Sequence, residues 1–298
     1  YFTYKKRSIF RHRAANTGFF ESVHFVFDEK KVLEKYNFPV TDEALELLNP
    51  IVNTLDTLRS TLLTGLLKAA SNNVKSGYGQ VKLFEIGSVF DSQREETLKL
   101  SVLFSGEREN QGLVNAGKPE SIDFATFVQK ITDVIGTFEL VKHTTSHTLS
   151  HLYQSASILI DGESIGELFR VHPDVEKEYG LGDTFVCEID FDKVPYGLKT
   201  AKKTSKYQAS TRDLSLIIPK SLPFENVKST IKKHATNELV NFYPVDKYTD
   251  ESLGEDISLS LRFILQSDEK TLEEEDINST MGAILDGLQN ELGIGLRE

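Results

Sequence analysis

The chain has 298 residues, 39% of them hydrophobic, which is enough for the cores of two ordinary domains. Its formal net charge of −11 argues against a protein that holds nucleic acid mainly through a general positive field. We therefore expect no DNA partner. A single cysteine, Cys187, excludes an intramolecular disulfide, and no apolar run approaches the roughly 20 residues that span a bilayer, so we expect a cytoplasmic chain without membrane contact.

The first two hundred residues predict helices and many strands. A basic amphipathic helix is expected at residues 5–17, a strand at 19–27 and a turn at Asn49-Pro50. Leu58, Leu62 and Leu66 begin the apolar stripe of a long helix that ends near Gly77. Later strands are predicted at 81–90, 98–105, 138–143, 156–160, 164–171 and 184–191, with a helix at 122–135. Strands joined by tight turns such as Asp161-Gly162 indicate an α+β domain with a large antiparallel sheet, followed by a linker at 195–206.

Residues 204–298 predict the order strand, helix, strand, strand, helix, short strand. The strands are expected at 213–220, 239–248 and 257–266, and the first helix at 224–234 after Pro223. The closing helix should start at a capping box of Thr271 and Glu274 and stop at Gly293. This βαββαβ order is the ferredoxin-like arrangement, with both helices on one face of the sheet. The other face would be free to meet a partner.

Three histidines, His143, His147 and His151, recur at steps of four, which on a helix would align metal ligands. The threonines between them disfavour a helix, and neither a cysteine nor a close acidic cluster completes a site, so we predict no metal there. The sequence contains no P-loop, no Gly-x-Ser-x-Gly and no paired-cysteine motif. It therefore predicts no catalytic residue.

Several short motifs carry a resemblance to a known family. The chain combines the Asn49-Pro50 turn, an Arg-x-x-Leu-Leu-x-Gly-Leu-Leu helix at 59–67 and the strand Phe84-Glu85-Ile86-Gly87. Further motifs are Gln154-Ser155-Ala156, His172-Pro173, Arg212-Asp213, Asp246-x-Tyr248 and Thr271-Leu272-x-x-Glu275. In this order they resemble the bacterial phenylalanine–tRNA ligase β subunit. Because the chain starts at Tyr1 and its only methionine is Met281, we expect a C-terminal piece of such a subunit.

The resemblance implies two domains and a division of labour. Residues 1–200 would be a degenerate, non-catalytic copy of the class II synthetase catalytic module, and residues 204–298 a ferredoxin-like anticodon-binding domain. The partners would be tRNA(Phe) and a catalytic α subunit in an α2β2 heterotetramer. ATP and Mg²⁺ would serve the complete enzyme and not this fragment, which would be inactive alone. We do not find the paired arginines that a working class II site uses for ATP, and a structural ion pair is the favoured role of Arg59.

Asp246 and Tyr248 are the strongest site candidates. Residues two apart on a strand point to one face, so a carboxylate acceptor and an aromatic ring would meet an unpaired base together. The resemblance implies that this pair meets the anticodon, with Arg212 and Arg262 as candidates for neutralising nearby phosphates. The alternative is a non-catalytic interaction protein that keeps these folds and has lost tRNA binding.

Overall fold

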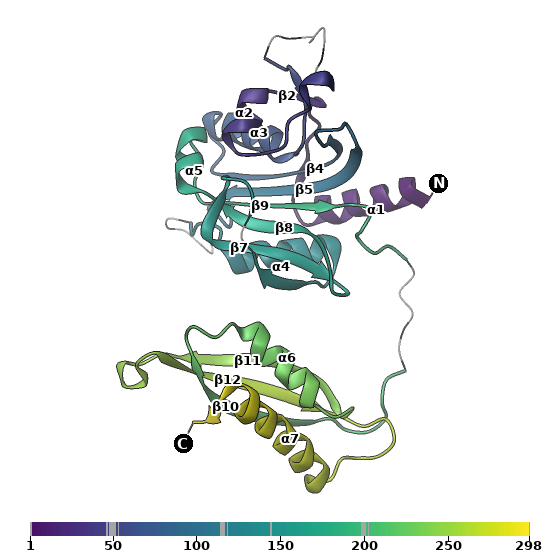
Figure 1. Cartoon of the computed structure of the whole chain (residues 1–298), viewed down its shortest axis with the longest axis vertical. Coiled ribbons are helices and arrows are strands. Elements are labelled where there is room, and N and C mark those ends of the chain that lie inside the picture. The colour runs from purple at the N-terminus through teal and green to yellow at the C-terminus, as the bar shows by residue number, and fades with distance from the viewer. Residues whose placement is uncertain are drawn as a thin grey trace. The chain divides into compact units, whose positions relative to one another are not determined.

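The computed structural model describes residues 2–297 except 46, 48–51, 53, 114–116, 118, 144, 198–200 and 202. It divides into two compact units, Tyr1–Gly197 and Leu198–Glu298 (Figure 1). The predicted turn at Asn49-Pro50 and part of the predicted linker lie outside the described residues. Both units mix helices with sheets, so the predicted α+β class is confirmed. None of the helices among the described residues is both long and apolar enough to cross a membrane.

A seven-stranded sheet organises the first unit. Its strands, from one edge to the other, are β1 (Phe20–Glu21), β4 (Gln80–Phe90), β5 (Glu96–Gly106), β9 (Thr184–Asp190), β8 (Glu163–Val171), β7 (Ser150–Ile160) and β6 (Glu139–Lys142). Every neighbouring pair is antiparallel except β1 with β4. The turn between β7 and β8 is the predicted Asp161-Gly162 pair, whose φ values of 52° and 80° suit a tight hairpin.

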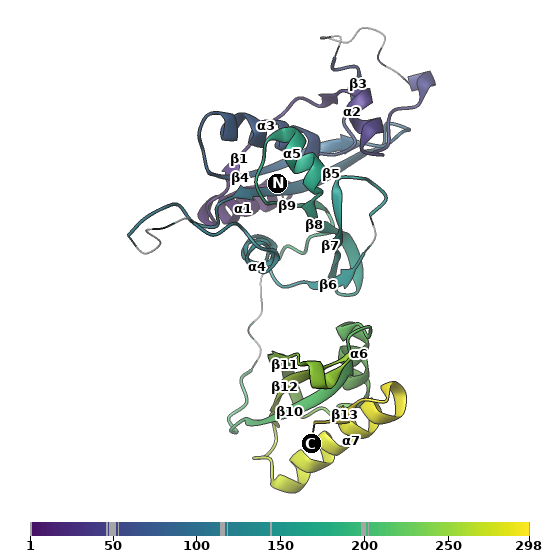
Figure 2. The ribbon, with the colours of Figure 1, turned by 90° about the vertical axis from the view of Figure 1, so that its left-hand side faces the viewer.

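Helices cover both faces of this sheet, which gives the first unit two apolar cores (Figure 2). On one face α1 (Phe2–Asn16) and α4 (Phe124–Ile135) bury Phe10 and Phe127 against the strands. On the other face α3 (Leu63–Lys75) and α5 (Pro173–Tyr179) bury Leu66 and Val175 against the strands. Because the second core covers only part of its face, the rest of that face is left for polar side chains.

Three predictions for the first unit were wrong in extent. The strand expected at 156–160 already begins at Ser150, as β7. The strand expected at 19–27 is reduced to β1 and β2 (Phe27–Asp28), because the residues between them have no continuous strand partner. The helix expected from Leu58 starts at Leu63, since Leu58 belongs to β3 (Thr57–Leu58), which pairs with β2. The helix α2 (Lys30–Lys35) and a short 3-10 turn, η1 (Glu43–Leu45), complete the unit.

The second unit contains the predicted βαββαβ order. The elements are β10 (Ser210–Pro219), α6 (Phe224–His234), β11 (Leu239–Tyr248), η2 (Glu251–Leu253), β12 (Asp256–Leu265), α7 (Glu274–Leu292) and β13 (Gly295–Leu296). The sheet order is β11-β12-β10-β13, with antiparallel neighbours throughout. Val227 of α6 and Ile284 of α7 are buried against Leu261 and Phe263 of β12, so both helices lie on one face (Figure 2).

The start of α7 differs from the prediction by two residues. Glu273 is the N-cap, and its backbone N–H donates to Asp276 Oδ2 at 3.0 Å, while its own side chain accepts from the backbone of Asp276. The predicted pair, Thr271 and Glu274, therefore does not form the capping box. The Glu273 carboxylate takes the capping position in place of the threonine hydroxyl, and four acidic residues in a row leave the register open to sequence reasoning. Gly293 ends the helix in the left-handed conformation, as predicted, with φ 66°.

Candidate functional site

The sheet of the second unit has one face that its own helices leave uncovered, called here the free face. Strand register assigns residues to it. Asp246 lies opposite Ser260 and Tyr248 opposite Ser258, two serines that alternate with the buried Leu259 and Leu261. The two candidates therefore share the free face, as the sequence predicted, and both are exposed.

Tyr243 reaches the same face because β11 is irregular. The register shifts between Pro244 and Asp246, which leaves Val245 without an opposite residue. Tyr243 consequently lies opposite Arg262 on the free face, although its odd number would place it opposite to Asp246 and Tyr248 on a regular strand. Sequence reasoning missed this residue. The proline inside the strand was the available signal, since proline favours edge strands and bulges.

Tyr248 belongs to a small polar cluster at one end of the free face. Its hydroxyl donates to Asp250 Oδ2 at 3.1 Å, and the guanidinium carbon of Arg297 lies 4.9 Å from the centre of its ring. Arg297 also reaches Ser258 Oγ, at 3.5 Å. Backbone and side-chain hydrogen bonds from Ser252, together with the bond from Tyr248, lower the pKa of Asp250. One side of the ring thus lies under a cation, and Tyr248 itself remains 42% exposed.

The two predicted arginines lie on opposite faces. Arg262 donates from Nε and Nη2 to the two carboxylate oxygens of Asp213, at 2.9 and 2.7 Å, across the free face. This fork lowers the pKa of Asp213 and raises that of Arg262. Arg212 lies opposite the buried Phe263, on the helix face, and pairs with Glu274 at 2.6 Å. The structure therefore brings Arg262, but not Arg212, to the face that carries Asp246 and Tyr248.

A row of polar side chains crosses the large sheet of the first unit, on the face that α3 and α5 partly cover. Glu85 lies opposite Ser101, Ser101 opposite Glu188, and Glu188 opposite Glu167. Lys99 follows on the next rung of the ladder. The polar row therefore consists mainly of carboxylates.

Arg59 crosses to this row from the segment before α3 and neutralises Glu85. Its Nη1 lies 2.7 Å from Glu85 Oε1, and the two side chains are only 6% and 3% exposed. His24 Nδ1 lies 2.6 Å from the other carboxylate oxygen. Burial alone would raise the pKa of Glu85, but the His24 hydrogen bond and the Arg59 charge outweigh it and lower that pKa. The predicted structural ion pair of Arg59 is confirmed, and Gly87 is close enough that an added Cβ would lie 2.4 Å from Arg59 Nη2.

Lys99 neutralises Glu188 in the same way. Its Nζ lies 2.7 Å from Glu188 Oε2, while Ser101, Thr61 and the backbone N–H of Leu62 donate to Oε1. Burial opposes ionisation of Glu188, yet Lys99 and these donors hold its pKa below the ordinary value. Phosphoryl oxygens need fixed cationic donors that are free to bind them. Arg59 and Lys99 are already paired with carboxylates, so this row is poorly suited to a nucleotide.

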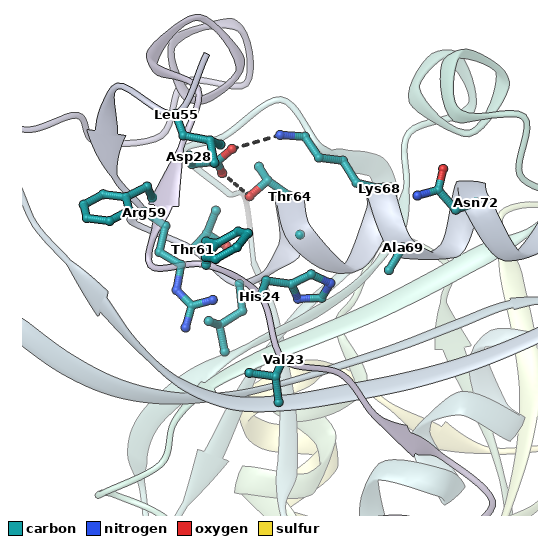
Figure 3. Close-up of a pocket in the computed structure, with 14 residues that line it drawn as sticks. Val23, His24, Asp28, Leu55, Arg59, Thr61, Thr64, Lys68, Ala69 and Asn72 are labelled. Carbon is teal, nitrogen blue, oxygen red and sulfur yellow. Dashed lines mark hydrogen bonds and ion pairs between the residues drawn. The ribbon is translucent and has the colours of Figure 1, made fainter. Parts of the chain in front are cut away.

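A pocket of about 450 Å³ lies beside α3 (Figure 3). Figure 3 shows Thr64 and Lys68 directed at Asp28, and Lys68 Nζ is 3.0 Å from Asp28 Oδ1. Burial alone would lower the pKa of Lys68, but the Asp28 carboxylate raises it above the ordinary value. The rim carries Val23 and Phe25, which are strongly exposed apolar side chains. Asp28, Thr64 and Lys68 are thus paired with one another inside the pocket, and its rim offers an apolar contact surface.

Two of the three spaced histidines meet at one carboxylate, Glu167, and the third does not. His147 Nε2 lies 2.8 Å from Glu167 Oε1, His143 Nε2 lies 3.7 Å from the other oxygen, and His151 contacts the ring of Tyr153 instead. Within the part of the chain that the structure describes, no group of three or more His, Cys, Asp or Glu side chains could hold a metal ion. His172 accepts from the backbone N–H of Asp174 and so caps the start of α5, which is a structural role.

The sequence also matches two known families. Residues 2–191 match the family described as the phenylalanyl tRNA synthetase beta chain CLM domain. Residues 205–297 match the ferredoxin-fold anticodon binding domain.

Curated relatives match the whole chain. The phenylalanine–tRNA ligase beta subunit of Sulfurimonas denitrificans is 61% identical over 297 residues, which are 100% of this chain and 38% of the relative. The beta subunit of Wolinella succinogenes is 39% identical over 100% of this chain and 38% of the relative. That of Campylobacter jejuni is 38% identical over 96% of this chain and 36% of the relative. The chain thus spans somewhat more than a third of the length of these relatives.

Among solved structures, a pyrrolysyl tRNA synthetase of Desulfitobacterium hafniense is similar to this chain with a TM-score of 0.47 and 12% sequence identity. The similarity covers 64% of this chain and 65% of that chain. The family match over residues 2–191 covers well over half of the chain. This chain therefore belongs to the phenylalanyl-tRNA synthetase beta chain family.

Proposed function

We propose that the chain works as part of the β subunit of a cytoplasmic phenylalanine–tRNA ligase, where it helps to charge tRNA(Phe) without making or breaking bonds itself. The first unit, as a degenerate class II catalytic-like module, scaffolds the catalytic α subunit of an α2β2 heterotetramer. The second unit contacts the anticodon. The names of the relatives support the assignment to a β subunit, and the match to the anticodon-binding family supports the role of the second unit.

The observation that carries the anticodon role is the shared position of Asp246 and Tyr248 on the free face. An unpaired base stacks on the side of the Tyr248 ring that Arg297 leaves open, while the Asp246 carboxylate accepts from exocyclic amino groups. From residue 204 onward the chain has ten Lys and Arg against seventeen Asp and Glu. Binding on this unit therefore depends on local stacking and on cations held in place, such as Arg262 and Arg297, more than on a general field.

The scaffolding role rests on the first unit's charges and surface. Because Arg59 and Lys99 neutralise Glu85 and Glu188, the polar row gives stability and not a nucleotide site. ATP and Mg²⁺ would act in the α subunit of the complete enzyme. Three strongly exposed apolar side chains, Phe20, Val23 and Phe25, lie close together in sequence on the segment after α1, and we place the contact there.

The test combines two measurements on one preparation. The chain is co-expressed with the α subunit of a phenylalanine–tRNA ligase, and the purified material is tested for retention of an unmodified tRNA(Phe) transcript. We expect co-purification and retention. Asp246→Ala should weaken retention, although it removes a negative charge, while Asp286→Ala, the same change at an exposed position on α7, should not. Co-purification without any retention of tRNA would favour the alternative of an interaction protein that has lost RNA binding.

A further inference from the structure

The free face carries a second aromatic side chain with the same presentation as Tyr248. Tyr243 and Tyr248 both come from β11 and are 40% and 42% exposed. The bulge at Val245 places Tyr243, Asp246 and Tyr248 on successive free-face rungs, opposite Arg262, Ser260 and Ser258. The two rings therefore flank one carboxylate.

The spacing of the two rings fixes what they can hold. Their opposite residues, Arg262 and Ser258, are four residues apart on β12, which corresponds to ~13 Å at ~3.3 Å per residue. Bases that stay stacked on each other are only ~3.4 Å apart. Neighbouring stacked bases therefore cannot cover both rings. An RNA that uses both must spread its bases along the strand, as single-stranded recognition commonly does.

The surroundings of Tyr243 suit an RNA strand. Arg262 lies beside it and is held in place by the two hydrogen bonds to Asp213. Asp213 is the main cause of the raised pKa of Arg262, and a hydrogen bond with the Tyr243 hydroxyl raises that pKa further. A guanidinium has five N–H donors, so the fork with Asp213 leaves others for a phosphate. Pro244 and the bulge interrupt the backbone of β11, which disfavours addition of a further protein strand at this edge.

We propose that Tyr243 is a second base-stacking site of the free face. It holds an unpaired base of the same RNA that Tyr248 contacts, at a nucleotide not stacked on the Tyr248 base. This inference rests on the proposed anticodon role. It adds a second base-binding subsite, and it implies that the RNA runs along β11.

The experiment uses the whole chain and a synthetic RNA hairpin that carries the anticodon arm of tRNA(Phe). Affinities are measured for the parent, Tyr243→Ala, Tyr243→Phe, Tyr248→Ala and the control Val240→Ala, a truncation of another exposed side chain on β11. Thermal melting checks that each variant is folded. Tyr243→Ala should weaken binding roughly 5- to 150-fold, the range expected for losing one stacked base. Tyr243→Phe and Val240→Ala should bind as the parent does.

A second set of hairpins, each with one loop nucleotide made abasic, identifies the base at each ring. The effect of Tyr243→Ala should vanish at one abasic position, and that of Tyr248→Ala at a different one. Unchanged affinity of Tyr243→Ala, or loss of both effects at the same nucleotide, would overturn the inference. If Tyr248→Ala weakens binding and Tyr243→Ala does not, only the second site fails. If neither variant matters, or the parent does not bind, the proposed function fails as well.

Discussion

Arg59→Met is expected to lower the free energy of unfolding of the first unit by about 3–5 kcal/mol, because it leaves the buried Glu85 carboxylate without its main counter-charge. The variant keeps most of the side-chain volume, so loss of packing contributes little. Native-state hydrogen exchange of the β4 amides measures the effect. The β12 amides of the second unit serve as an internal reference, and their protection should not change.

The same variant has a predictable dependence on pH. The folded-state pKa of Glu85 is lowered, so its contribution to stability is present above the ordinary value of 4.5 and is lost as the pH falls through the folded-state pKa. Without Arg59 that lowering shrinks. The difference between parent and variant should therefore be largest near neutral pH and should diminish in acid. Arg108→Met, which removes a half-exposed partner of Asp123, should cost less than about 1 kcal/mol, and an equal loss in both variants would argue against a special role for Arg59.

Tyr248→Ala in a complete ligase containing this chain is expected to lower kcat/KM for tRNA about 5- to 150-fold. Loss of one base-stacking contact costs about 1–3 kcal/mol, and Tyr248 is the ring next to the Asp246 acceptor. Amino-acid activation, followed as phenylalanine-dependent ATP–pyrophosphate exchange, should change little because the anticodon does not take part in it. Aminoacylation and exchange assays on the same preparation give both values.

The matched control for this prediction is Tyr248→Phe. It keeps the ring beneath Arg297 and removes only the hydroxyl that donates to Asp250. Most of the tRNA dependence should survive. Equal losses in aminoacylation and in exchange for Tyr248→Ala would mean that the residue supports the structure of the enzyme and not its contact with the anticodon.

Elements with strong local patterns were predictable from the sequence. The bounds of α6 and β11 agree with the expectation at both ends, because apolar spacing and the flanking residues carry the information locally. The polar ladder and Arg59 are different. Arg59 meets Glu85 across 26 residues of sequence, and Lys99 meets Glu188 across 89, so no local pattern pairs them.

The free face shows why only part of the candidate site could be predicted. Asp246 and Tyr248 follow the period of two, and their common face needed no more than that. Tyr243 depends on a bulge that shifts the period, and Arg297 depends on β13 returning beside β10. Arg212 follows the period of two as well, in phase with the buried Leu216 and Ile218. The strand pattern therefore already indicates the helix face for Arg212, where the structure has it, and only the family motif made it a candidate.

We propose that this chain positions partners and makes no bonds, since Arg59 and Lys99, the two cations of the polar row, are already paired with carboxylates. Phenylalanine-dependent ATP–pyrophosphate exchange by the purified chain alone, with Mg²⁺ present and the complete ligase as positive control, tests this most directly. We predict no exchange above the protein-free background. Exchange by the chain alone that Lys99→Met abolishes would contradict the account, because it would place a working nucleotide site on the polar row.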